Sequence, residues 1–391
     1  MPEVPSRAGV VRWQGALDLL RLVRRQPGIT RAAAAQALGL SSGSAAEITA
    51  RLRELRLLDE RPVPAAGRGR PTTALLAGSE GPLVAVVDIR HEDWEIAVAD
   101  LAGGLVGQAH GRRPGDRPAA LLRTLRRALD KTIRGYGSRL RAVSVSVAGT
   151  VQGGRLVQAS TMGWPAVDLG ELSSLPLLVG NDASLSGVAE ARRGTASDAR
   201  TVLHLIVEVG IGGVLVDRGT ALTGATGAGG EFGHLPFGDP ALACPCGAYG
   251  CWDLEVDGRA MARHRNQRPP ADPWSYAAGT LAEARAGDPD ASRAVRRCAT
   301  ALGRGVAGLV NALDPDLVTL GGFAAPLLDQ AGEELSASYA AGLMSFRRRV
   351  PPPLRPAALG TRGPLIGAAE VAFDAVLTER GLSDWAARPT P

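Results

Sequence analysis

Long apolar runs, cysteine and lysine are all scarce in this chain of 391 residues. No stretch of about 18 consecutive apolar residues is present, which excludes a membrane-spanning helix. The first residues, MPEVPSRAGVVRWQ, lack the apolar core of a signal peptide, so we expect a cytoplasmic protein that does not contact a membrane. The chain is long enough for two or three domains that bury their cores without disulfide staples.

Charged residues are unevenly distributed along the chain. Residues 1–80 contain 12 arginines and 7 acidic residues, whereas residues 81–391 contain 32 basic and 32 acidic residues. The net charge of +5 therefore arises entirely in the first fifth of the sequence. This distribution indicates a nucleic-acid-binding head on a neutral body.

Two short helices are predicted in the basic segment, after a first helix that Pro27-Gly28 ends. Thr30 is the expected N-cap of the first short helix, RAAAAQALG, and Ser41 is that of the second. The second helix has an apolar stripe and an opposite polar face. Two such helices are typical of a helix-turn-helix, whose second helix enters the major groove of DNA. A plain helical bundle with solvated arginines is the alternative.

A basic turn after these helices favours the DNA-binding interpretation. The stretch GRGRP, residues 67–71, lies between two strand-like segments, as in the wing of a winged helix. Arg68 and Arg70 suit a narrow minor groove, where the electrostatic potential is most negative. We therefore predict a winged helix-turn-helix over residues 10–78. Its expected DNA-contacting residues are Ser42, Ser44, Glu47, Arg51, Arg68 and Arg70.

Three of the four cysteines lie within eight residues, in the stretch HLPFGDPALACPCGAYGC. The spacing His-x9-Cys-x-Cys-x4-Cys supplies one imidazole and three thiolates, the set that closes a tetrahedral zinc site. A reactive thiol cluster and a disulfide with bystander cysteines are the alternatives, and disulfides are rare in the cytoplasm. We predict one structural zinc ion per chain and place Cys298 in the core. The predicted ligands are His234, Cys244, Cys246 and Cys251.

The stretch GGEFGH, residues 229–234, followed by CPCGAYGC, resembles the signature of the ROK family of sugar kinases and repressors. The resemblance implies an α/β protein with a two-lobed actin-like, ribonuclease-H-like kinase body. The α+β head resembles the winged helix-turn-helix that the family's repressors carry and its kinases lack. The implied lobes are residues 82–180, completed by a C-terminal helix at 361–380, and residues 181–360, with the zinc loop and a dimerisation surface.

The segment that holds ATP phosphates in the family's kinases is altered in this sequence. The family pattern after the first strand is Asp-x-Gly-Gly-Thr, whose glycines let backbone amides close on a phosphate. Here Asp88 is followed by Ile-Arg-His-Glu-Asp, and Glu92 and Asp93 add negative charge. We therefore expect no ATP binding and no kinase activity. The later glycine-rich segments 208–213 and 317–322 partly match the family, but they also fit an ordinary hairpin and a buried strand.

The sugar-binding positions of the family are better retained. Asp182 matches the position of the kinase general base, and here we expect it to accept a hydrogen bond from a sugar hydroxyl. Ser160-Thr161 departs from the family pattern, in which an Asn-Leu pair precedes Gly-Trp. The resemblance implies contacts to a carbohydrate effector from Gly149, Asn181, Asp182, Glu231, His234 and Asp253.

The leading interpretation is a transcriptional regulator, a repressor, that binds double-stranded operator DNA as a homodimer or homotetramer. Its body senses a small carbohydrate through a cleft that no longer binds ATP. One alternative is an active ATP-dependent sugar kinase with an added DNA-binding head. Another is a regulator that has lost its small-molecule ligand and responds to a partner protein.

Overall fold

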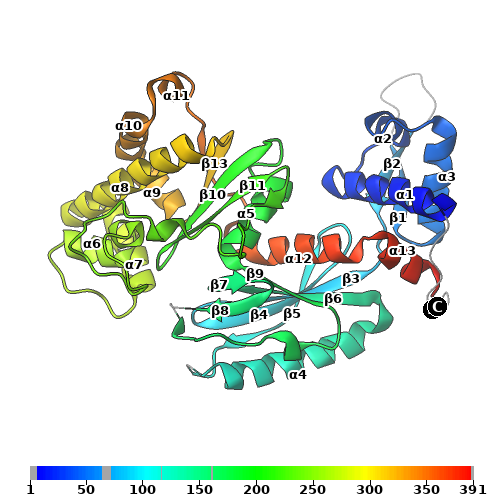
Figure 1. Cartoon of the computed structure of the whole chain (residues 1–391), viewed down its shortest axis with the longest axis horizontal. Coiled ribbons are helices and arrows are strands. Elements are labelled where there is room, and N and C mark those ends of the chain that lie inside the picture. Colours follow the sequence, from blue (N-terminus) through cyan, green and yellow to red (C-terminus); the bar gives the residue numbers. More distant parts are fainter. Residues whose placement is uncertain (1–6, 64–71, 116, 160–161, 389–391) are drawn as a thin grey trace. The chain divides into compact units, whose positions relative to one another are not determined.

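A computed structural model describes residues 7–63, 72–115, 117–159 and 162–388 (Figure 1). The fold is α/β, as predicted, and the chain divides into two compact units. Unit 1 comprises Met1–Val145, Leu169–Leu178 and Ala368–Pro391, and unit 2 comprises Ser146–Asp168 and Val179–Gly367. None of the described helices combines the length and the apolar character needed to span a bilayer.

Unit 1 begins with a winged helix-turn-helix head. Thr30 caps one helix by accepting a hydrogen bond from the Ala33 amide at 3.2 Å, and Ser41 caps the next by accepting from the Ser44 amide at 3.1 Å. Both caps are as predicted. The wing strands pair antiparallel, and the predicted wing turn with Arg68 and Arg70 lies outside the described residues. The elements of the head are α1 (Arg7–Arg25), α2 (Arg31–Ala37), α3 (Ser42–Glu54), β1 (Leu58–Val63) and β2 (Thr72–Ala77).

The body of unit 1 is built on a five-stranded sheet of order β5-β4-β3-β6-β9. Its first three strands form an antiparallel meander. Helix α4 runs along the sheet (Figure 1) and buries Leu121, Leu125 and Leu129, which recur every fourth residue on one face. The elements are β3 (Leu83–Ile89), β4 (Asp93–Ala99), β5 (Leu105–Arg112), α4 (Pro118–Tyr136), η1 (Gly137–Arg139), β6 (Leu140–Val147), η3 (Gly170–Leu172) and β9 (Leu177–Asn181).

Unit 2 contains a second five-stranded sheet, of order β12-β11-β10-β13-β14. Strand β10 pairs antiparallel with β11 and parallel with β13, as expected for a chain that returns through helices. The strands are β7 (Thr150–Gln152), β8 (Arg155–Gln158), β10 (Thr201–Val207), β11 (Ile211–Asp217), β12 (Thr220–Ala221), β13 (Leu317–Gly322) and β14 (Leu354–Pro356).

The helices of unit 2 include a long one, α8, that forms the spine of its core together with α10. They are α5 (Asp182–Arg193), η4 (Phe232–His234), η5 (Trp252–Glu255), α6 (Gly258–His264), α7 (Pro273–Arg285), α8 (Pro289–Leu313), α9 (Ala324–Gln330), α10 (Gly332–Gly342), α11 (Ser345–Arg349) and η6 (Gly360–Arg362). Helix α12 (Gly363–Val376) begins in unit 2 and ends in unit 1, where α13 (Glu379–Ala386) follows.

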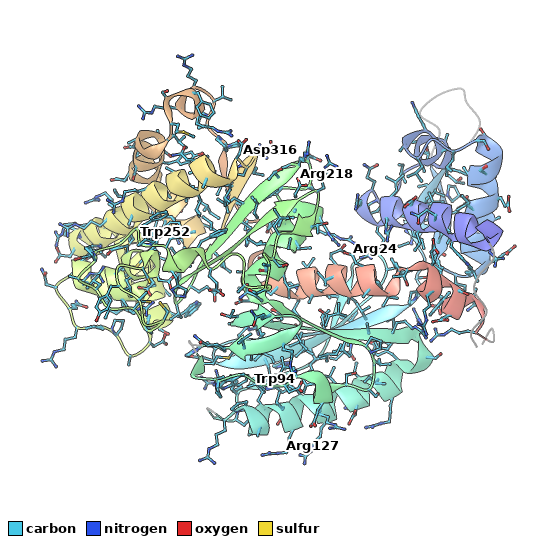
Figure 2. The ribbon with its side chains drawn as sticks, viewed as in Figure 1. Arg24, Trp94, Arg127, Arg218, Trp252 and Asp316 are labelled. Atoms are coloured by element: carbon cyan, nitrogen blue, oxygen red, sulfur yellow. The ribbon has the colours of Figure 1, made fainter. Side chains whose placement is uncertain are left out.

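Trp252 anchors the segment that follows the cysteine loop in the core of unit 2 (Figure 2). Its side chain is fully buried, and its indole nitrogen donates a hydrogen bond to the Ala301 carbonyl of α8 at 3.0 Å. A Cβ at Gly305 would collide with the indole ring, so only glycine fits at that position of α8. This packing holds in place the backbone that directly follows Cys251.

Candidate functional site

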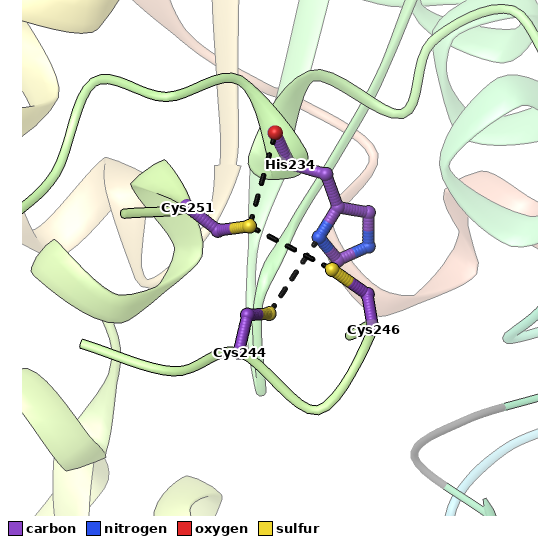
Figure 3. A group of neighbouring side chains, drawn as sticks. All are labelled: His234, Cys244, Cys246 and Cys251. Carbon is purple, nitrogen blue, oxygen red and sulfur yellow. Dashed lines mark hydrogen bonds between the residues drawn. The ribbon is translucent and has the colours of Figure 1, made fainter. Parts of the chain in front are cut away.

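His234, Cys244, Cys246 and Cys251 come together in unit 2, with all four ligand atoms within 4.8 Å of one another (Figure 3). The Sγ of Cys244 lies 3.9 Å from His234 Nδ1, and the Sγ atoms of Cys246 and Cys251 are 3.7 Å apart. A disulfide requires about 2.05 Å between sulfurs, so these cysteines are free thiols. The donor set and its convergence fit a metal ion with four protein ligands.

The backbone of the cysteine loop brings the sulfurs to one side. Gly247 and Gly250 adopt φ angles of +97° and +69°, which side chains other than that of glycine rarely allow. The Cys244 amide donates to the Ala248 carbonyl at 2.8 Å, which closes the turn between the first two cysteines and the third. These two glycines therefore let the backbone of the loop turn sharply around the cluster.

Two of the three thiols resist ionisation, because their pKa values are raised. Burial, with the neighbouring thiols of Cys244 and Cys246, raises the pKa of Cys251 to about 12. Burial likewise raises the pKa of Cys244. A bound metal ion stabilises thiolates and releases their protons. The cluster therefore has the ligand chemistry of a closed metal site.

Both nitrogens of His234 also lie near carboxylates. Its Nε2 lies 3.9 Å from Glu231 Oε2, and its Nδ1 lies 3.5 Å from Asp253 Oδ2. Glu231 Oε1 accepts a hydrogen bond from Thr150 Oγ1 at 3.0 Å. Asp253 is 7% exposed and accepts from the Ile211 amide at 2.6 Å, and burial raises its pKa above the ordinary value. Three predicted sugar-contacting residues are thus neighbours.

Asn181 makes two hydrogen bonds within unit 2, one to Gly149 and one that caps α5. Its Nδ2 donates to the Gly149 carbonyl at 3.1 Å, and its Oδ1 caps α5 by accepting from the Ser184 amide at 2.9 Å. A Cβ at Gly149 would lie 2.6 Å from the Gln158 carbonyl oxygen, so the close approach requires glycine. Asp182 Oδ1 accepts from the Ala183 amide at 2.9 Å, at the first turn of α5.

The connection between Asn181 and the carboxylate cluster runs through one residue that the sequence interpretation missed. Thr150 follows Gly149 in the chain and bonds Glu231. Its position next to a glycine already assigned to the site was the only available signal, because hydroxyl residues are common in turns. The six predicted effector residues lie in unit 2 on three stretches of chain, around residues 149, 181 and 231–253.

An arginine fills the turn where the family's kinases carry their first phosphate loop. Arg90 donates to Asp93 Oδ1 at 2.6 Å and to Asp88 Oδ2 at 3.2 Å, and its guanidinium lies 3.7 Å from Glu95 Oε2. Asp88 is 1% exposed. One guanidinium therefore pairs with three carboxylates at the end of β3, a cluster that the sequence interpretation did not anticipate.

The negative charge expected to repel a phosphate here is compensated within the protein. Asp93 pairs with Arg90, and Glu92 lies 3.4 Å from Arg112 on the neighbouring strand. Charge repulsion by Glu92 and Asp93 is therefore a weaker obstacle to a phosphate than expected. Two local features still distinguish this turn from the family's phosphate-binding pattern. It lacks the two glycines, and it contains the Arg90 guanidinium.

The second glycine-rich segment closes the hairpin between β10 and β11. The Glu208 amide donates to the Gly210 carbonyl at 2.9 Å, and the next amide along, that of Ile211, is bonded to Asp253. A Cβ at Gly212 would lie 2.6 Å from that of Ala183. Packing therefore accounts for a glycine at position 212, without any role in binding a phosphate.

The predicted DNA-reading helix presents its polar face to solvent. Ala45, Thr49 and Leu52 of α3 are buried against the rest of the head. The Arg51 guanidinium lies 5.3 Å from the ring of Trp13, which holds its stem over α1. The exposed residues of this face include Ser42, Ser44, Glu47 and Arg51.

The fold and these clusters define an α/β protein with a sugar-kinase-like body and an N-terminal winged helix-turn-helix. Residues 84–375 match the model of the ROK family, and the chain belongs to that family.

Two relatives of this chain are sugar kinases. A glucokinase of Streptomyces coelicolor is 28% identical over 307 residues, which are 73% of this chain and 96% of that protein. An N-acetylgalactosamine kinase of Shewanella sp. is 29% identical over 251 residues, which are 60% of this chain and 80% of that protein. Both matches leave a substantial part of this chain uncovered.

Two solved structures have the same fold. A ROK family transcriptional regulator, a homolog of the Escherichia coli MLC protein, superposes with a TM-score of 0.77 at 21% identity and covers 96% of this chain and 98% of its own. A ROK glucokinase from Streptomyces griseus, in complex with glucose and AMPPNP, gives 0.65 at 25% identity and covers 75% of this chain and 99% of its own.

The four-ligand cluster predicts about one metal ion per chain in freshly purified protein. Cys246→Ser should lose the metal and lower the melting temperature, because removing one ligand opens the site. Cys298 is fully buried outside the cluster, and Cys298→Ser should keep the metal. Elemental analysis and thermal melting of both variants measure this. Wild-type protein without bound metal would contradict the assignment.

Proposed function

We propose that the chain is a transcriptional repressor that binds operator DNA through its head and senses a sugar through its body. The observation that carries this proposal is the winged helix-turn-helix joined to a ROK body. The superposition on the ROK regulator covers 96% of the chain, whereas the glucokinase structure covers 75%. The exposed polar face of α3 is the surface that would read the major groove.

The proposed effector is a hexose or an N-acetylhexosamine. Glu231, His234 and Asp253 place hydrogen-bonding atoms close together, as a ligand with several neighbouring hydroxyls requires. Asn181 and Asp182 stand at the cap and the first residue of α5, and they add further hydrogen-bonding side chains. The names of the related glucokinase and N-acetylgalactosamine kinase support this class of ligand.

Zinc is the metal we propose for the cysteine cluster. Three thiolates and one imidazole are its preferred structural ligands, and four protein donors leave no open coordination position. The residues present fit that role, because their donor atoms already converge. Bound zinc would crosslink the cysteine loop to His234, and the ring would then keep its Nε2 toward Glu231.

We further propose that the chain is not a kinase. The turn after Asp88 offers no glycine amides to a phosphate, and Arg90 occupies it in three ion pairs. Opening that cluster to admit ATP would separate Arg90 from Asp88, which is 1% exposed. Arg90 is partly exposed, but its departure would leave the buried Asp88 carboxylate without that guanidinium, which is unfavourable.

A sugar kinase with an added DNA-binding head is the second candidate. Its support is that both curated relatives above are kinases and that Asp182 stands at the matching base position. The two candidates differ in whether ATP is consumed, and they can be distinguished by one assay.

The repressor predicts no sugar-dependent release of ADP. Purified protein with ATP, magnesium and either glucose or N-acetylgalactosamine should give no product above background in a coupled ADP assay. The Streptomyces coelicolor glucokinase serves as the positive control for glucose. Product formation that disappears in Asp182→Ala would instead establish the kinase.

Sugar binding should depend on the carboxylate cluster. A thermal-shift screen of sugars and phosphosugars identifies the effector, since a ligand that binds the folded state raises its melting temperature. Glu231→Ala should weaken that sugar roughly 5- to 150-fold, because losing one partner of a buried hydrogen bond costs about 1–3 kcal/mol. Metal content should stay unchanged, because Glu231 is not a ligand. Unaltered sugar affinity in Glu231→Ala, measured by calorimetry, would place the effector elsewhere.

DNA binding should depend on α3 and on salt concentration. Arg51→Ala should weaken binding to a selected operator duplex by about 1–3 kcal/mol and lower the salt dependence of the affinity. Arg127→Ala removes the same charge from an exposed position of α4 in the body and should leave the affinity unchanged (Figure 2). Fluorescence anisotropy at several salt concentrations measures both variants. Equal affinity of Arg51→Ala and wild type would exclude α3 as the reading helix.

A further inference from the structure

An ion pair within unit 1 joins the head to the C-terminal end of the chain. Arg24, in the last turn of α1, donates to Glu370 Oε1 of α12 at 2.8 Å, and the two side chains are only 6% and 9% exposed. The guanidinium also lies 4.2 Å from the centroid of the Phe373 ring, one turn further along α12 (Figure 2). Charged side chains are seldom buried this deeply, and this pair lies outside the sugar cluster and the DNA-reading face.

A second contact reinforces the attachment of the head. Trp385 of α13 donates its indole N–H to the carbonyl of Leu55, the C-cap residue of α3, at 2.9 Å. Helices α1 and α13 also pack on one another. The C-terminal helices thus hold α1 and the end of the predicted DNA-reading helix by two polar contacts at different points.

The other end of α12 packs on α5 within unit 2. A Cβ at Gly367 would collide with the Leu185 carbonyl oxygen, and a Cβ at Gly363 would lie 2.5 Å from Ser186 Oγ. The two helices are therefore in backbone contact, which only glycine permits. Helix α5 begins at Asp182, directly after its cap Asn181, so the N-terminus of α5 belongs to the proposed sugar site.

We propose that Arg24 and Glu370 are a positioning pair that fixes the head on α12, and that α12 transmits movement of α5 to the head. The proposal rests on the repressor function above and names its route of regulation. Residues 363–367 of α12 contact α5 in unit 2, and residues 370–373 hold the head in unit 1. A shift of α5 when sugar binds is carried along this one helix.

A buried charged pair suits positioning better than an apolar contact would. A hydrogen-bonded guanidinium and carboxylate have one favourable geometry, whereas apolar side chains slide past each other at small cost. The head is therefore held at a defined angle to α12. In a dimer, that angle sets the distance between the two reading helices and hence the preferred spacing of half-sites.

The test uses the full chain and two kinds of DNA probe. Wild-type protein first selects its half-site from a pool of random-sequence duplexes. That half-site is then placed in duplexes either once or twice, with the spacing of the pair varied one base pair at a time. Affinity for the single half-site reports on the fold of the head, and the spacing dependence reports on how the head is held.

Glu370→Gln should bind the single half-site with an affinity within about twofold of wild type. The ratio of its affinities for the best and the worst spacing of paired half-sites should fall by about fivefold or more. Arg24→Lys keeps the charge and should retain part of the spacing preference. Asp384→Asn removes an exposed carboxylate from α13 and should behave as wild type. An unchanged spacing profile in Glu370→Gln, or equal losses on single and paired half-sites, would overturn the positioning role.

The transmission part is tested in unit 2. Gly367→Ala should change the affinity for paired half-sites about fivefold or more without altering the single half-site. Gly279→Ala is the matched control, because its Cβ would meet no atom within 4 Å. If Gly367→Ala melts below the assay temperature, the milder Gly363→Ala replaces it. A folded variant that binds paired half-sites as wild type does would overturn transmission. Failure of wild type to select any duplex would reject the repressor function itself.

Discussion

The imidazole of His234 is the point on which the site in unit 2 depends, because this one ring contacts both the cysteine cluster and the carboxylates. Nδ1 lies near the Cys244 sulfur and the Asp253 carboxylate, and Nε2 lies near Glu231. In this orientation the ring reaches both clusters. The short η4 helix, the positive-φ glycines of the cysteine loop and the buried Trp252 after it all serve to hold that orientation.

The segments expected to bind sugar and phosphate differ in how far they keep the residues typical of the family. The sugar side keeps an ordered cluster of acceptors around His234 and Asn181. The first phosphate segment instead contains an internal ion-pair cluster around Arg90. The proposed repressor requires this distribution, because a ligand that binds one arrangement of the parts more tightly shifts the equilibrium without a chemical step.

The features that the sequence predicted are those set by local spacing. The caps Thr30 and Ser41, the strand pair of the wing and the convergence of the cysteine ligands each depend on a few consecutive residues, and each is found in the structure. The features it missed depend on tertiary placement. The hydrogen bond of Thr150 to Glu231 spans 81 positions, and the pairing of Arg24 with Glu370 spans 346. Neither residue type nor neighbouring pattern marks such partners, because arginine and threonine are ordinary surface residues.

The attachment of the head to α12 has a consequence for the order in which the protein matures. During synthesis Arg24 leaves the ribosome 346 residues before its partner Glu370, and Phe373 and Trp385 follow later still. Until they emerge, Arg24 has no carboxylate to pair with, and Leu55 lacks the indole donor. The head can fold early as a local unit, yet its docking must await the synthesis of α12 and α13. A product that lacks these two helices would therefore carry a folded head without its two polar attachments.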